Sequence, residues 1–80
     1  MYYVYAIRSL TRNYIYVGLT DDLQRRLYQH SNGLNPTTSP YAPFELIYSR
    51  AFQTRAQARQ KEKYLKSGVG KEFLRGLRWK

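Results

Sequence analysis

The stretch from residue 3 to residue 33, YVYAIRSLTRNYIYVGLTDDLQRRLYQHSNG, decides the fold of this chain. Two runs rich in Tyr, Val and Ile have the composition of β-strands: Tyr2–Arg8 and Asn13–Leu19. With a hairpin loop at residues 9–12, Tyr5 pairs with Tyr16, and directly opposed residues share one face of a sheet. The sequence therefore predicts two phenols side by side on one face.

The residues at the end of the second run indicate a close contact and then a helix start. Gly18 lies on the same face as Tyr16, where its missing side chain leaves room for a closely approaching group. Thr20, Asp21 and Asp22 supply the acceptors and the negative charge preferred at a helix N-terminus. We therefore expect a helix to begin directly after the second strand.

This expected helix has one buried stripe with a basic border. Leu23, Leu27 and His30 follow the spacing of a buried face, and Arg26 lies beside it, one turn before His30. Gly33 is a suitable residue to end the helix. Because the leucines anchor the helix, Arg26 and His30 are expected to lie near the tyrosine pair.

The segment Leu34–Pro43 holds all three prolines and lacks periodicity, which is typical of a loop. Its length suggests a surface flap beside the site. Its polar side chains are expected to be solvated, with contact to a backbone phosphate as the alternative: Thr37, Thr38, Ser39 and Tyr41.

The second half of the chain predicts a third strand and two more helices. Phe44–Arg50 alternates, which places Phe44, Leu46 and Tyr48 on one face and Glu45, Ile47 and Ser49 on the other. One helix is expected from Arg55 to about Ser67, with Thr54 as its N-cap. A break at residues 68–70 should separate it from a last helix at residues 71–77, with Trp79 near the end.

Glu62 is the anomaly of the longer helix. The buried stripe should run through Ala58, Glu62 and Leu65, so a carboxylate stands where the pattern asks for an apolar residue. Such departures tend to occur at functional sites. The structural alternative is a salt bridge with the neighbouring Lys and Arg side chains. A Glu62 that points into solvent, or is fully paired with a lysine of its own helix, would contradict a functional role.

Composition limits the fold and favours an anionic partner. Eighty residues without cysteine make one domain, residues 1–80, with no disulfide or thiolate metal site. The net charge is +9, and from residue 50 onward ten Lys or Arg face two Glu. That asymmetry suits a polyphosphate, although a solvated helix face would give the same pattern. Neither a signal peptide nor a membrane-spanning stretch is visible, so a soluble intracellular protein is expected.

Two three-residue motifs and several later residues carry a family resemblance. The motifs are Tyr3-Val4-Tyr5 and Tyr16-Val17-Gly18, followed by residues 22–27, His30 and the run 58–66 that contains Glu62. In order and spacing the chain resembles the GIY-YIG nuclease superfamily over nearly its whole length, in the small bacterial group that is little more than the catalytic domain. It departs from the pattern at Tyr3 and Val4, where the name motif has Gly and Ile.

The resemblance implies an α+β fold, with a three-stranded antiparallel sheet flanked by helices, and a role for each site residue. Glu62 would hold one divalent ion, Mg²⁺ or Mn²⁺, and Arg26 would clamp the scissile phosphate. Tyr5 and Tyr16 would share water activation and phosphate positioning, and which phenol is the base stays open. His30 would donate to phosphate or relay a proton, with a structural role as the alternative. The remaining nucleic-acid contacts are expected from the basic residues Arg25, Arg26, Arg59, Lys63 and Lys66.

The function expected is that of a Mg²⁺-dependent endonuclease that hydrolyses DNA phosphodiester bonds. Sequence specificity is not expected; cutting directed by DNA structure, such as branched, nicked or damaged DNA in repair, or by a protein partner, is expected instead. The alternatives are a non-catalytic or weakly catalytic DNA- or RNA-binding module and a subunit active only with a partner. The expected location is the cytoplasm, at the nucleoid, with no membrane contact. The oligomeric state is left open.

Overall fold

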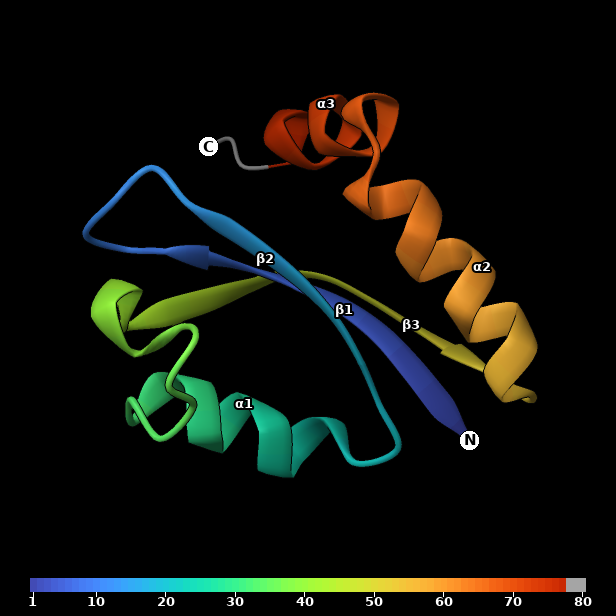
Figure 1. Ribbon diagram of the computed structural model, residues 1–80, viewed down its shortest axis with the longest axis horizontal. Coiled ribbons are helices and arrows are strands. Elements are labelled where there is room, and N and C mark those ends of the chain that lie inside the picture. Colours follow the sequence, from blue (N-terminus) through green and yellow to red (C-terminus); the bar gives the residue numbers. More distant parts are fainter. Residues whose placement is uncertain (78–80) are drawn as a thin grey trace.

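The computed structural model describes residues 1–77 and confirms the predicted α+β architecture (Figure 1). Its elements, in chain order, are β1 (Tyr2–Ser9), β2 (Ile15–Thr20), α1 (Leu23–Ser31), the short 3-10 helix η1 (Ser39–Tyr41), β3 (Phe44–Phe52), α2 (Arg55–Lys66) and α3 (Gly68–Gly76). Trp79 lies outside the described residues. Among residues 1–77, no helix is both long and apolar enough to span a membrane.

The three strands form one antiparallel sheet in the order β2-β1-β3. Tyr5 pairs with Gly18, and Tyr16 pairs with Ile7, so the predicted pairing of Tyr5 with Tyr16 is wrong by two residues. The hairpin loop is longer than expected because the Ser9 hydroxyl accepts hydrogen bonds from backbone amides in the loop, at 3.2 and 3.0 Å. A shift of two keeps every side chain on its predicted face, since side chains alternate with period two.

The pairing of β3 with β1 contains a β-bulge, which corrects the predicted faces of this strand. Ala6 pairs with Tyr48 but Ile7 pairs with Leu46, so Ile47 is the extra residue. The bulge puts Leu46 on the opposite face from Tyr48, whereas strict alternation predicted the same face. Even-numbered residues of β3 therefore lie on one face of the sheet before the bulge and on the other face after it.

The sheet has helix α1 on one face and helices α2 and α3 on the other (Figure 1). The apolar core lies on the α2 and α3 side and consists of buried side chains from the sheet and both helices: Val4, Ala6, Val17, Ala58, Leu65 and Leu74. The opposite face carries Tyr5 and Tyr16 toward α1. The fold thus uses one side of the sheet for stability and keeps polar aromatic residues on the other.

Helices α2 and α3 join without a loop. Ser67 is the C-cap of α2 and the N-cap of α3, and its hydroxyl accepts from the Gly70 amide at 3.2 Å. The expected break at residues 68–70 is therefore wrong, because these residues form the first turn of α3. Gly70 permits the tight corner, since a methyl group there would overlap the Tyr64 carbonyl oxygen and the Leu65 backbone.

Candidate active site

Tyr5 is the buried centre of the α1 side of the sheet. Its side chain is 1% exposed and crosses Gly18 so closely that a Cβ there would lie 2.5 Å from the phenol oxygen. The group predicted to approach Gly18 is therefore the Tyr5 ring. Tyr16, half-buried on the same strand as Gly18, has its ring centroid 6.3 Å from that of Tyr5. The predicted phenol pair exists, with the two rings placed diagonally.

His30 links the phenol pair to the loop that follows α1. Its Nε2 lies 2.8 Å from the Tyr5 hydroxyl, and its Nδ1 lies 2.8 Å from the Thr38 hydroxyl. The imidazole is 1% exposed, and its centroid is 5.1 Å from that of Tyr16. Because both ring nitrogens have protein partners, the arrangement holds Tyr5 in place and leaves neither nitrogen open to a phosphate.

Thr38 is the site residue that the sequence did not reveal. We expected a solvated loop side chain or a phosphate contact, and the structure instead buries it completely against His30. Its environment depends on the path of the loop, which includes η1 and is tied to the hairpin by a 2.6 Å hydrogen bond from the Ser9 hydroxyl to the Tyr41 carbonyl. No periodic pattern in the loop could have indicated this, because the contact joins segments far apart in the chain.

The two central groups of this site are neutral near pH 7. Burial raises the pKa of the Tyr5 phenol, the neighbouring Tyr16 and Glu62 raise it further, and the Arg26 guanidinium lowers it. Burial also lowers the pKa of the His30 imidazole, and Arg26 lowers it further. A neutral imidazole has one donor and one acceptor nitrogen, so it can bridge two hydroxyl groups.

The charges of Arg26 and Glu62 both act on the Tyr5 phenol, and the two residues come from different helices. Arg26 is half-buried on α1, where a guanidinium nitrogen contacts the Gln29 amide oxygen at 3.4 Å. Glu62 is on α2, between the buried residues Ala58 and Leu65. The structure therefore pairs the two predicted tyrosines and places Arg26 and Glu62 where their charges act on Tyr5, and the joint role of these four residues stays a prediction.

Glu62 also forms the salt bridges that were the structural alternative. Its two carboxylate oxygens lie 3.5 Å from the Arg59 guanidinium and 3.2 Å from the Lys66 ammonium, both on its own helix. The Glu62 side chain is 14% exposed, whereas its two partners are more than half exposed. Both carboxylate oxygens are therefore paired within α2, as the structural alternative requires, and a catalytic role requires Glu62 to exchange these solvated, weakly stabilising partners.

The donor set fits a metal ion only as a single-carboxylate site. Among residues 1–77, no three His, Cys, Asp or Glu side chains are grouped to hold a metal. Glu62 can offer a hard oxygen ligand to Mg²⁺, an ion that keeps several waters and is often completed by substrate phosphate. Glu62 would therefore be a lone carboxylate ligand, and the single-metal site expected from the sequence stays a prediction.

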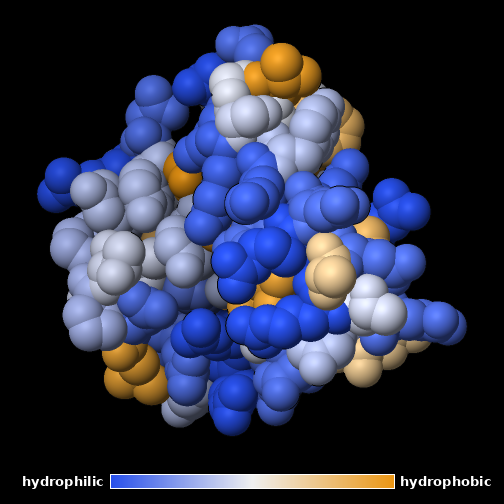
Figure 2. All heavy atoms as spheres, turned by 45° about the vertical axis from the view of Figure 1, so that its right-hand side comes forward, coloured by the Kyte–Doolittle hydropathy of each residue, from blue (hydrophilic) through white to orange (hydrophobic). Residues whose placement is uncertain are grey.

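The residues expected to contact nucleic acid differ in their surroundings. Arg25 is exposed and lies 3.8 Å and 4.0 Å from the carboxylates of Asp21 and Asp22. Arg59 and Lys66 pair with Glu62, and Lys63 is exposed on the same helix. A mainly hydrophilic surface covers the side of the molecule on which α2 lies (Figure 2). Most of these cations thus surround Glu62 on α2.

Comparison with known proteins shows the family of the chain. Residues 1–74 match the family of the GIY-YIG catalytic domain. The chain belongs to the GIY-YIG family. It is also 33% identical over 72 residues to the UPF0213 protein of Bacillus pumilus, covering 89% of this chain and 72% of that protein. It is 32% identical over 66 residues to the UPF0213 protein YazA of Bacillus subtilis, covering 81% of this chain and 66% of that protein.

A solved structure supports the same assignment. The solution NMR structure of the UPF0213 protein BH0048 from Bacillus halodurans matches with a TM-score of 0.57 and 32% identity, over 98% of this chain and 86% of that chain. In this GIY-YIG domain the first motif, residues 3–5, lies in β1 and the second, residues 16–18, in β2. The family is a nuclease superfamily, and this chain is one of its small UPF0213 members.

Proposed function

We propose that this protein is a metal-dependent endonuclease that hydrolyses DNA phosphodiester bonds. The observation that carries the proposal is the pair of phenols Tyr5 and Tyr16, with ring centroids 6.3 Å apart, in a chain whose residues 1–74 match the GIY-YIG catalytic domain. The charges of Arg26 and Glu62 both act on the Tyr5 phenol and support it. A cation for the phosphate, a carboxylate for a metal and two phenols beside the attacking water would together serve phosphodiester hydrolysis. These groups come from β1, β2, α1 and α2, so only the folded chain assembles them.

Each residue has a distinct part in this proposal. Arg26 holds the scissile phosphate, because its forked donors suit a tetrahedral anion. Tyr16 contacts the attacking water, because it is the more exposed of the two phenols. Tyr5, held by His30 and through it by Thr38, positions Tyr16. His30 therefore acts as a positioning residue.

Glu62 would hold the metal, whose charge stabilises the developing negative charge on phosphate and leaving group. For that, the carboxylate would have to leave its pairs with Arg59 and Lys66. These two cations would then be free to contact the DNA backbone, together with Arg25 and Lys63. Contacts of this kind fix a duplex without reading its bases, so we propose that the substrate is selected by structure, as in nicked or branched DNA, or by a protein partner. The protein would act in the cytoplasm on the nucleoid.

The proposal is tested by incubating supercoiled plasmid and a panel of nicked and branched DNAs with Mg²⁺ or Mn²⁺. Wild type should cut, and Arg26→Ala should lose most of its turnover while its neighbour Arg25→Ala mainly weakens binding. Tyr16→Phe should lose more activity than Tyr5→Phe. Binding of every substrate without cutting under either metal would instead identify a nucleic-acid-binding module.

A further inference from the structure

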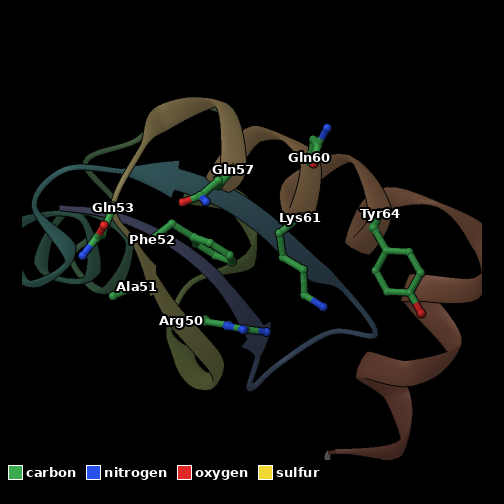
Figure 3. A pocket seen from close by; sticks show the side chains of 8 residues that line it. All are labelled: Arg50, Ala51, Phe52, Gln53, Gln57, Gln60, Lys61 and Tyr64. Carbon is green, nitrogen blue, oxygen red and sulfur yellow. The ribbon is translucent and has the colours of Figure 1, made fainter.

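A groove lies between β3 and α2, and neither Tyr5 nor Tyr16 is among the residues that line it (Figure 3). It has a volume of about 610 Å³. One wall comes from the end of β3 and the turn after it, and the other from one face of α2. Strand β3 is at the edge of the sheet opposite β2, so the groove and the second motif, residues 16–18, are on different edges.

The groove combines cations, aromatic rings and amides without any carboxylate. The Arg50 guanidinium carbon lies 5.3 Å from the centre of the Phe52 ring, and the Lys61 nitrogen lies 5.0 Å from the centre of the Tyr64 ring. Three glutamines, among them Gln57, complete the polar lining. In Figure 3 the Arg50 and Lys61 side chains extend toward one another from the two walls of the groove. The groove is therefore suited to an anionic ligand that also has flat apolar faces.

The position of the groove on α2 relates it to the candidate active site. Gln57, Lys61 and Tyr64 are spaced so that they lie on one face of the helix. Glu62 is about 140° around the helix axis from Gln57, across the buried stripe. The exposed outer face between them carries Lys63 and other basic residues. A strand that passes over this outer face would reach both the groove and Glu62.

We propose that this groove binds a single-stranded segment of DNA that flanks the bond to be cut. Its cations would pair with phosphates, its aromatic rings would stack on bases, and its glutamine amides would accept or donate hydrogen bonds at base edges. Single-stranded DNA is favoured over duplex because stacking on Tyr64 needs an unstacked base. An acidic peptide would use the cations but not the exposed ring. The inference rests on the proposed function for its biological meaning, but strand binding can be measured separately.

The test measures binding of a fluorescein-labelled oligo-dT to the full chain in EDTA, so that cleavage plays no part. The groove variant is Gln57→Glu with Gln60→Glu, and the matched control is Asn13→Asp with Gln24→Glu, which adds the same charge at other exposed sites. We expect the groove variant to bind about tenfold more weakly than this control, because carboxylates repel phosphate. Thermal unfolding of each variant establishes that it is folded.

A second pair of variants separates stacking from charge. Tyr64→Ala should weaken binding about tenfold, whereas Tyr64→Phe should bind like wild type because it keeps the ring. Equal oligo-dT affinity of the groove and control variants would overturn the proposal. Displacement of labelled oligo-dT by poly-glutamate as effectively as by unlabelled oligo-dT would also overturn it. Loss of oligo-dT binding in a protein that cuts no DNA would support the groove and contradict the nuclease. DNA cutting together with unchanged oligo-dT binding in the groove variants would support the nuclease and contradict the groove.

Discussion

At the scale of single residues, Tyr5, His30 and Thr38 form a buried hydrogen-bonded chain from β1 through α1 to the following loop. The chain ends at a completely buried hydroxyl, so it does not lead a proton to solvent. Its effect is to fix the Tyr5 ring against Gly18 and beside Tyr16. The orientation of Tyr5 therefore depends on a loop threonine whose hydroxyl is bonded to His30 rather than to the phenol.

Thr38→Val should destabilise the protein by about 1–3 kcal/mol, because it leaves the buried Nδ1 of His30 without its partner. Valine has nearly the same shape as threonine, so the loss of stability measures the contribution of the hydroxyl group. Thr37→Val is the matched control, since Thr37 is exposed and should change stability little. Urea unfolding of the three proteins measures the difference. Equal stability of the two variants would show that the hydrogen bond is not needed.

Gly18→Ala should displace the Tyr5 ring, because the new methyl group would lie 2.5 Å from the phenol oxygen. Breaking the packing and the contact with His30 should cost about 1–3 kcal/mol of stability and most of the cleavage activity. At Gly76 a Cβ would have open space, so Gly76→Ala should be neutral or slightly stabilising. Thermal unfolding compares the two alanines, and a similar effect of both would refute the close approach.

Stability should fall on mild acidification because of His30. The folded-state pKa of this imidazole lies below the unfolded value of about 6.5, so the unfolded chain binds more protons between the two values. Stability is therefore complete above about pH 6.5 and decreases as the pH falls toward the lowered pKa. His30 is the only histidine, so NMR titration of its ring signals reports this pKa without ambiguity. A folded-state pKa at or above 6.5 would disprove the effect.

Many contacts of individual site residues were predictable from the sequence, and the others depended on the tertiary structure. The phenol pair follows from the two strand runs, and the room at Gly18 follows from its missing side chain. The salt bridges of Glu62 follow from cations spaced three and four residues away on its helix. The partner of His30 could not be predicted, because the loop that carries Thr38 has no repeating pattern.

At the scale of elements, the sequence indicates which segments form strands and helices better than how they join. Strand composition and helix caps correctly predicted β1, β2, β3, α1 and α2. The hairpin register and the bulge at Ile47 could not be predicted, because both depend on hydrogen bonds of the loop and of the partner strand. The start of α3 was missed, because glycines near a helix end are usually terminators.

Ser67→Ala should destabilise the junction of α2 and α3. The hydroxyl accepts from the Gly70 amide and donates to the Tyr64 carbonyl at 2.5 Å, so one side chain serves two helix ends. The loss should be about 1–2 kcal/mol, as for an N-cap. Ser31→Ala, at an exposed position of α1, is the control and should change stability little. Melting temperatures that do not differ between the two variants would contradict this role.

At the scale of the whole molecule, the fold divides its surfaces by chemistry. The apolar core joins the sheet to α2 and α3, and the opposite face of the sheet holds the buried phenol and imidazole under α1. The basic residues on α2 connect the region of Glu62 with the groove beside β3. The net charge of +9 is thus partly concentrated on a surface that adjoins the candidate active site, as binding to a polyphosphate requires.

The central claim is that Glu62 supports catalysis in addition to pairing with its own helix. The most direct test is single-turnover cleavage of nicked and branched DNA in Mg²⁺ by Glu62→Gln. Glu72→Gln is the matched control, because Glu72 is exposed and pairs with Arg75 at 3.2 Å. We predict that Glu62→Gln binds DNA normally but cuts at least about 100-fold more slowly, while the control cuts like wild type. Equal cleavage rates for the two variants would contradict the account.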